Sequence, residues 1–403
     1  MNYARSQRRI RLALYSSIVV LSAAALAGAL LPFHPGHPPT DPVDSSAATA
    51  LTTRLGGSDL STTAIAVSRA AYPLSGAAGA VILVPEGDWM TGLIAATLAA
   101  APVNAPILPV PRGPMPAEIE EEIRRLSPRG INWDGGIQIL ALGQIDGQVI
   151  DQIDRIGLTC RHIDASTAAE LAERVDHYRA ILTGNHPDQV LIVSADAAEF
   201  ALIAASWAAH SGHPVLFVEN RVLPRATRRA LDLRPADAFV YVLAPEEAVP
   251  EALMDEMSFF GCVQRIPGGD PFEMAAAFAR YTDRGADFRW WLGANPRVFG
   301  PGVSGPGQNL IFVDIDEPMG AAVAAGLSQR GAHGPLLWVQ GDRLPDPVEQ
   351  LLAAIRPAGG RRLDPLFNRG WLIGDEDAIN PRTRQLIEDA LRAADAEEAI
   401  DVR

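Results

Sequence analysis

The chain has 403 residues, a formal net charge of −14 at pH 7 and 48% hydrophobic residues. This length is typical of about two to four domains, and the mean hydropathy of +0.08 indicates a globular protein with a large core and excludes a disordered chain. The negative charge excludes non-specific binding to nucleic acid, which requires a positive potential.

The N-terminal residues are typical of a targeting segment. Arginines at positions 5, 8, 9 and 11 precede an apolar stretch over residues 12–31. That stretch is about 20 residues long, which is enough to span a bilayer, and the arginines would keep the N-terminus inside. We expect a signal anchor, a transmembrane helix, over residues 1–33. The alternative is a signal peptide cleaved after Ala27. Either way, we expect the rest of the chain to be exported to the cell surface or the periplasm.

A proline-rich spacer over residues 34–50 follows the apolar stretch. Its prolines at positions 35, 38, 39 and 42 predict a stiff, extended segment.

The remaining chain repeats one pattern three times. Each copy has an apolar run typical of a strand, an alanine-rich stretch, and a proline that opens a second apolar run. Ten residues after that proline, another proline opens a charged segment typical of a helix. The first runs are Val81–Val84, Val190–Val193 and Leu310–Val313, and the proline pairs are Pro106/Pro116, Pro214/Pro224 and Pro335/Pro345. A repeat of about a hundred residues is a small domain copied in tandem.

The order of elements within a copy predicts an α/β fold. A third apolar run follows the charged helix in every copy, at Ile137–Leu142, Phe239–Leu243 and Trp371–Ile373. Strands that are separated by helices of 10–15 residues are typical of βαβ crossovers and a mainly parallel sheet.

The repeat sets the expected domain boundaries. We expect module 1 over residues 51–159, module 2 over 160–263, module 3 over 264–391, and a charged tail over 392–403. Each copy is expected to begin with a helix that follows an arginine-containing phrase, at Arg54, Arg161 and Arg265. The third copy is longer because of an insert, Asp283–Gln308, which contains Trp290 and Trp291.

These phrases resemble the cell wall-binding repeat 2 family of bacterial surface proteins, over residues 51–391. Repeats of that family carry an R-x-x-G-x-D helix start, an alanine-rich helix and a P-I-L-L strand. The resemblance implies three tandem Rossmann-like modules with mainly parallel sheets in a pseudo-threefold arrangement. It also implies non-covalent binding to an anionic cell-wall polymer or glycan, with the P-I-L-L segments near the binding surface. The ligand-binding residues predicted on this basis are Arg54, Arg161, Arg265, Ile107, Leu108, Val215, Leu216, Leu336 and Leu337.

The residues themselves leave alternatives open. A guanidinium can bind phosphate or carboxylate in a fork, but each arginine could instead pair with its own downstream acid, Asp59, Asp164 or Asp270. The P-I-L-type runs read as buried strands, so that only their ends, near Pro109, Phe217 and Trp338, would face a ligand.

A catalytic site is not expected. Asp314, Asp316 and Glu317 follow a strand and could hold a divalent cation, but the other two copies lack this set. We therefore expect a binding protein and not an enzyme, with no cofactor and no metal. The alternative function is a structural subunit of an envelope assembly whose repeats contact other proteins. Cys160 and Cys262 occupy similar places in successive copies and are either disulfide-bonded or two buried thiols.

Overall fold

The computed structural model describes residues 49, 51–283, 285–286, 288–290, 308–329, 332–356 and 368–392. The predicted anchor over residues 1–33 lies outside these residues, as do nearly all of the spacer and the tail and much of the insert. None of the helices in the described ranges is both long and apolar enough to cross a membrane.

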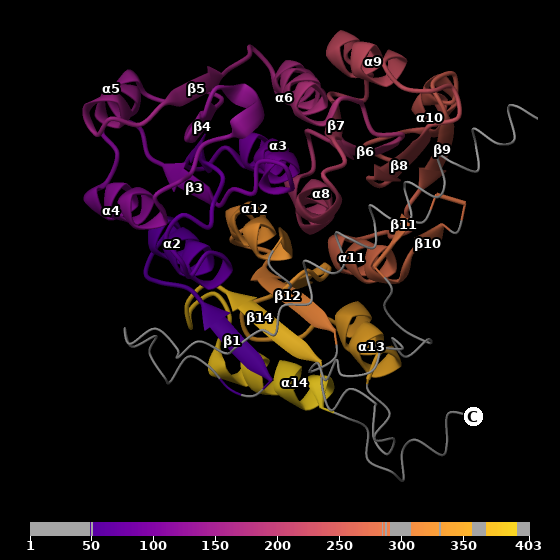
Figure 1. Cartoon of the computed structure of the whole chain (residues 1–403). Coiled ribbons are helices and arrows are strands. Elements are labelled where there is room, and N and C mark those ends of the chain that lie inside the picture. The colour runs from indigo at the N-terminus through magenta and orange to yellow at the C-terminus, as the bar shows by residue number, and fades with distance from the viewer. Residues whose placement is uncertain are drawn as a thin grey trace, which may run out of the picture. The chain divides into compact units, whose positions relative to one another are not determined.

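The first sheet has the strand order β3-β2-β4-β5, and its strands all pair in parallel (Figure 1). The first four residues of its central strand β2 are buried, as expected for an unbroken apolar run. The elements are α2 (Leu60–Ala71), β2 (Val81–Pro85), α3 (Trp89–Ala99), β3 (Ile107–Val110), α4 (Ala117–Leu126), the 3₁₀ turn η1 (Asn132–Asp134), β4 (Ile139–Leu142), α5 (Gly147–Arg155) and β5 (Cys160–Ile163).

The second sheet has the equivalent order β7-β6-β8-β9, again with parallel pairing. A short antiparallel hairpin follows it. The elements are α6 (Ala168–Thr183), β6 (Gln189–Ser194), α7 (Ala198–Ala201), η2 (Leu202–Ala204), α8 (Ala205–Ser211), β7 (Val215–Val218), α9 (Arg225–Asp232), β8 (Phe239–Leu243), α10 (Glu251–Met257), β9 (Cys262–Arg265), α11 (Pro271–Arg280), β10 (Thr282–Asp283) and β11 (Phe288–Arg289).

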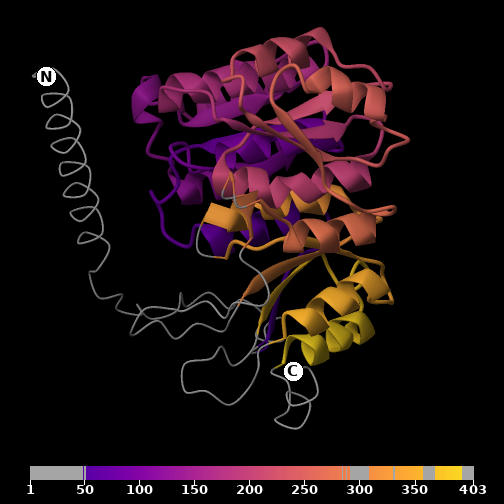
Figure 2. The same ribbon diagram turned by 90° about the vertical axis from the view of Figure 1, so that its right-hand side faces the viewer.

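The third sheet takes its edge strand from the other end of the described chain. Its order is β1-β14-β12-β13, with parallel pairing throughout. Figure 2 shows α13 and α14 on one side of this sheet and α12 on the other. The elements are β1 (Thr52–Leu55), β12 (Asn309–Asp314), α12 (Met319–Ala324), η3 (Ala325–Gln329), β13 (Leu336–Val339), α13 (Asp346–Ala354), β14 (Arg369–Ile373) and α14 (Pro381–Leu391).

The prediction of three α/β units with parallel sheets is confirmed. The first apolar run of each copy forms the strand that lies between the second and third runs. The register repeats as well: the residue that follows each strand-opening proline pairs with the equivalent residue of the central strand. These pairs are Ile82↔Ile107, Leu191↔Val215 and Ile311↔Leu336.

The second proline of each copy marks the start of a helix, as the spacing predicts. Pro116, Pro224 and Pro345 are the N-cap residues of α4, α9 and α13. Proline is tolerated there because its missing N–H would have no partner inside the helix.

The alanine-rich helices α3, α8 and α12 contact one another pairwise (Figure 1). Their small side chains permit close approach: a Cβ atom added to Gly92 of α3 would lie 2.9 Å from the Cβ of Ala322 in α12. α3 and α12 also contact the strands of their own sheets. These helices therefore join the three units to one another as well as covering the sheets.

The arginine-containing phrases form strands, although their sequence pattern predicts the start of a helix. Cys160–Ile163 is the edge strand β5 of the first sheet, and Cys262–Arg265 is the edge strand β9 of the second. β1 likewise completes the third sheet. A module boundary drawn at residue 159 or 263 therefore falls just before or inside the last strand of a sheet.

The two cysteines are free thiols on different sheets. Cys160 in β5 is half-buried, and Cys262 in β9 is exposed, so that the interpretation as two buried thiols is wrong for Cys262. Burial raises the pKa of the Cys160 thiol to about 11.

We expect iodoacetamide to label one cysteine per chain quickly at pH 8. The thiolate is the reacting form, and of the two cysteines only Cys262 is exposed. Mass spectrometry of the labelled peptides measures the result. The Cys262→Ser variant should show almost no rapid labelling, and equal labelling of both cysteines would contradict the burial of Cys160.

The described part of the insert packs against the core. Trp290 is buried, and its ring lies 5.1 Å from Trp207 and 6.3 Å from Phe278 between centroids. Trp290 of the insert therefore fills the core, whereas Trp291 lies outside the described residues.

Candidate functional site

Arg54 lies near the carboxyl end of β1 and binds the loop that follows β14. Its Nη1 donates to the carbonyl oxygens of Gly374, at 3.1 Å, and Asp375, and its Nη2 donates to the carbonyl oxygen of Ile379 at 2.6 Å. Burial is the main cause that lowers the pKa of Arg54. The guanidinium thus holds the N-terminal edge strand against the C-terminal loop.

Arg265 makes the equivalent contacts in the second sheet. Its Nη1 donates to the carbonyl oxygen of Ala244 at 2.9 Å, and its Nη2 donates to that of Val249 at 2.7 Å. It also forms an ion pair with Glu251, whose side chain is largely exposed. Arg265 therefore holds the loop after β8 as Arg54 holds the loop after β14.

In the first sheet, His162 and not Arg161 occupies this position. Arg54 pairs in register with Leu372, and Arg265 with Val242, each one residue before the end of its neighbouring strand. The corresponding pair in the first sheet is His162↔Ala141. The Nε2 atom of His162 lies 2.7 Å from the carbonyl oxygen of Gly143. Aligning Arg161 with Arg54 and Arg265 is therefore wrong by one residue, because His162 is their structural equivalent.

Arg161 points to a different loop. It forms an ion pair with Asp134 in η1, in which Nε donates to Oδ2 at 2.5 Å, and 43% of its side chain is exposed. The Asp134 carboxylate also accepts a hydrogen bond from the hydroxyl of Tyr178 at 2.8 Å. The three predicted arginines are therefore not brought together, and Arg161 has a separate role.

The expected pairing of the arginines with their downstream acids is wrong. Asp59 is the N-cap of α2, where its Oδ1 accepts from the Thr62 amide at 2.8 Å, and Asp270 caps α11 through the Glu273 amide at 2.8 Å. The hydrogen bond from Thr62 is the first cause of the lowered pKa of Asp59. Asp164 accepts instead from the side chain of Gln144 at 2.6 Å. Capping satisfies helix amide groups that would otherwise have no partner.

The six predicted aliphatic residues are all buried inside β3, β7 and β13. They are Ile107, Leu108, Val215, Leu216, Leu336 and Leu337. The residues that follow them are buried too, since Pro109, Phe217 and Trp338 belong to the same strands. Trp338 also donates from Nε1 to the carbonyl oxygen of Glu199 at 2.8 Å, which ties the third unit to the second. Side chains in these positions pack the core, and a polymer on the surface would not contact them.

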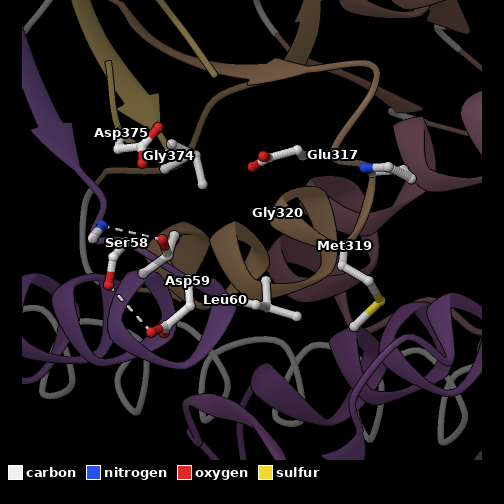
Figure 3. Close-up of a pocket in the computed structure, with 12 residues that line it drawn as sticks. Ser58, Asp59, Leu60, Glu317, Met319, Gly320, Gly374 and Asp375 are labelled. Atoms are coloured by element: carbon white, nitrogen blue, oxygen red, sulfur yellow. Dashed lines mark hydrogen bonds between the residues drawn. The ribbon is translucent and has the colours of Figure 1, made fainter. Parts of the chain in front are cut away.

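A cavity of about 250 Å³ lies at the carboxyl end of the third sheet (Figure 3). It is bounded by the first residues of α2, the first residues of α12 and the loop at Gly374–Asp375. Figure 3 shows Glu317 extending across this cavity towards Gly374 and Asp375, with Asp59 on the α2 side. Ligands of open α/β sheets bind at such strand ends, which makes this the natural pocket of the third unit.

The charge of this cavity is negative. Burial raises the pKa of Glu317, and the neighbouring charges of Asp375 and Asp314 raise it further. Asp314, at the end of β12, also has a raised pKa, first because of burial. An anionic ligand would be repelled here. The described residues contain no group of three His, Cys, Asp or Glu side chains placed to hold a metal ion.

We expect the Asp314→Asn variant to melt at a higher temperature than the unmodified protein at pH 7. Because folding raises the pKa of Asp314, the folded protein binds this proton more tightly than the unfolded chain does. Stability therefore falls as the pH rises past the pKa of Asp314 in the unfolded chain. An asparagine removes that charge, and its side-chain oxygen still accepts the hydrogen bond from the Asp316 amide. In the unmodified protein that amide nitrogen lies 3.1 Å from Oδ1 of Asp314. The expected gain is roughly 1–4 °C in Tm. Calorimetry should show the difference vanish below about pH 4, and a destabilised variant at pH 7 would contradict the argument.

Two solved structures resemble this chain over most of its length. Cwp8 from Clostridium difficile is 18% identical with a TM-score of 0.65, and the match covers 86% of this chain and 52% of that one. Cwp6 from Clostridium difficile is 16% identical with a TM-score of 0.65, covering 87% and 49%. No protein-family model and no curated protein matches the sequence. The chain spans about half the length of each solved neighbour, and at these identities the likeness establishes the shared fold.

Proposed function

We propose that this chain is a cell-surface protein whose three-unit head binds an anionic cell-wall or surface glycopolymer non-covalently. The observation that carries the proposal is the fold shared with Cwp8 and Cwp6, both cell-wall proteins, over 86% and 87% of the chain. In this proposal the three units stand in a pseudo-threefold arrangement outside the cytoplasm. The head acts by binding and not by catalysis.

The polymer would contact exposed cationic surface and not the residues expected from the repeat. The terminal guanidinium nitrogens of Arg54 and Arg265 already donate to backbone carbonyls, and the cavity beside Glu317 is negative. Exposed arginines such as Arg129 and Arg221 remain available on the surface. Weak contacts at several units would add up through effective concentration when one polymer chain reaches them together.

Retention of the head on purified wall polymer tests this function. We expect a variant that begins at Ala47 to bind the polymer at low salt and to be released as the ionic strength rises, because exposed charges are screened within about 10 Å at 0.1 M salt. The control is a neutral polysaccharide matrix, which should not retain the head. Absence of retention at low salt would overturn the proposal in favour of a structural subunit of an envelope assembly.

The N-terminal segment predicts membrane association of the full chain. We expect the full-length protein to sediment with membranes and the variant that begins at Ala47 to stay in the supernatant, because only the former contains the apolar residues 12–31. Fractionation followed by N-terminal sequencing measures both points. A mature N-terminus at Gly28 would establish a cleaved signal peptide instead of an anchor.

A further inference from the structure

A second cleft lies at the amino ends of the strands of the first sheet. Arg54, Arg265 and His162 lie instead near the carboxyl ends of their strands. The volume of the cleft is about 160 Å³, and it is lined by Gly79, Pro102 and residues 129–133. These residues come just before β2, β3 and β4, so the cleft faces the amino ends of those strands. Clefts that enclose drug-sized ligands measure about 300–1,000 Å³. This one is sized for a single ring whose attached groups remain in solvent.

One wall of the cleft is an exposed tryptophan. Trp133 lies in η1, and 77% of its surface is exposed. Single exposed apolar side chains are common on protein surfaces, and Trp133 is distinguished from them because it also lines a cleft. An indole presents a flat apolar face and an N–H group, which suit the C–H face and the hydroxyl groups of a pyranose.

The loop that carries Trp133 is held in place from both sides. Ile131 and Ile137 bridge the loop, with the Ile131 amide donating to the Ile137 carbonyl oxygen at 2.8 Å. Asp134, next to Trp133, is bound by both Arg161 and Tyr178. The Arg161 guanidinium also lies 5.8 Å from the centre of the Tyr178 ring. Arg161 thus positions the loop instead of contacting a ligand directly, and the loop backbone that carries the exposed indole is held in place.

The cleft is also lined by a cationic side chain, that of Arg129. Arg129 is exposed, while its backbone amide donates to the Ala78 carbonyl oxygen at 3.2 Å. Within the described part of the chain, its guanidinium has no hydrogen bond or ion pair. In the second unit, the segment between α9 and β8 also contains an arginine, Arg234, but that side chain is buried against Asp176. Arg129 differs in being presented to solvent at the mouth of a cleft.

We propose that this cleft binds an anionic pyranose, a sugar ring that carries a carboxylate or a phosphate. The ring stacks on Trp133, and the guanidinium of Arg129 binds the anionic group in a fork. The only carboxylate of the loop, that of Asp134, is turned to Arg161 and Tyr178, and so does not repel the ligand. The site deepens the proposed function, on which it rests, by naming the chemistry of the polymer unit that is recognised.

Fluorine NMR of the head labelled with 5-fluorotryptophan tests the site. The Trp133→Phe variant assigns the Trp133 resonance, and the probes are glucuronate, glucose 6-phosphate and glucose. We expect saturable shifts of that resonance with an anionic sugar and at least about tenfold weaker binding of glucose. The two anions separate a carboxylate-bearing unit from a phosphate-bearing one. A Trp133 resonance that no probe moves would overturn the proposal.

Matched variants separate this site from general charge effects. Arg129→Gln should weaken binding of the anionic sugar at least about tenfold, whereas Arg112→Gln, at another exposed arginine, should leave it unchanged. Binding measured by calorimetry should vanish in Trp133→Ala and persist in Phe259→Ala, which removes an aromatic ring that is 87% exposed. Equal weakening by Arg112→Gln would overturn the proposal. Melting curves check that each variant is folded.

Polymer retention distinguishes failure of this inference from failure of the proposed function. If Arg129→Gln and Trp133→Ala remain on the wall polymer as firmly as the unmodified head, the proposed function stands and this site is overturned. If the head binds anionic sugar at Trp133 but is not retained on wall polymer, the site stands and the polymer proposal fails. If Arg129→Gln and Trp133→Ala are no longer retained on wall polymer while the controls Arg112→Gln and Phe259→Ala still are, the site and the polymer proposal are both supported.

Discussion

Replacing Arg54 with alanine is expected to lower the free energy of unfolding by about 3 kcal/mol, which is one of the two largest effects predicted for this chain. Hydrogen bonds from a charged donor each contribute about 1.5–3 kcal/mol, and buried carbonyl groups left without a partner cost about 1–3 kcal/mol. Arg54 donates to three carbonyl groups, and Ile379, which carries one of them, is buried. The measurement is urea unfolding of the head that begins at Ala47.

The effect should be large because Arg54 joins the two ends of the described chain. β1 is far in sequence from the other strands of the third sheet, and among the described strands its backbone pairs only with β14. The Thr52 hydroxyl and Glu388 in α14 add a further contact at 2.5 Å. Without the guanidinium, the edge strand would separate more readily from the loop at Gly374–Asp375.

Arg161→Ala is the matched control for this prediction. The Arg161 side chain is 43% exposed, and ion pairs made by such exposed side chains contribute about 0–1 kcal/mol. We therefore expect Arg54→Ala to lose clearly more stability than Arg161→Ala, with polymer retention at 4 °C unaffected in Arg54→Ala. Equal losses in the two variants would show that the contacts of Arg54 do not close the third sheet. Loss of retention in a still-folded Arg54→Ala head would instead restore the arginine to a ligand-binding role.

The sequence predicted the central elements of each unit because their signals are local. Fully buried parallel strands need unbroken apolar runs, and the short runs at Val81, Val190 and Leu310, which the structure shows to be buried, have the length of such strands. The prolines at positions 116, 224 and 345 mark helix starts through a property of one residue. Both signals survive in all three copies although the neighbouring side chains differ.

The edge strands could not be predicted in the same way. β5 reads Cys-Arg-His-Ile and is only partly buried, so it has neither an apolar run nor a clear alternation. β1 is formed by four residues whose partner strand lies at the far end of the chain. Pairing of this kind depends on the closure of the whole structure, which local periodicity does not report.

The roles of the arginines were missed for a related reason. Arg54 and Arg265 bind backbone carbonyl groups, and every residue carries a carbonyl group, so no side-chain pattern identifies these partners. The capping roles of Asp59 and Asp270 were readable, since an acid before a helix is a common N-cap. The Trp133 cleft depends on a tertiary arrangement of three strand starts, for which the sequence contains no repeated signal.

Replacing Asp176 with alanine is expected to be at least as damaging, with a loss of about 3–5 kcal/mol. Asp176 in α6 and Arg234 after α9 form an ion pair whose side chains are 1% and 0% exposed. Nη2 of Arg234 donates to both carboxylate oxygens at 2.8 Å, and Nη1 donates to the Ala230 carbonyl oxygen. Removing the carboxylate leaves a cation enclosed by protein, and the cost of that desolvated charge is what makes the expected loss large.

Glu173→Ala is the matched control, because Glu173 lies on the same helix and pairs with Arg229 of α9 in an exposed ion pair. It should cost clearly less stability than Asp176→Ala, because solvent screens an exposed pair. The double variant Asp176→Leu/Arg234→Met removes both buried charges, and we expect it to recover most of the stability that Asp176→Ala loses. Urea unfolding of the four proteins gives the comparison. If the double variant is as unstable as Asp176→Ala, the pair contributes through its shape and hydrogen bonds to the α6–α9 contact, and the enclosed charge is not the cause of the loss.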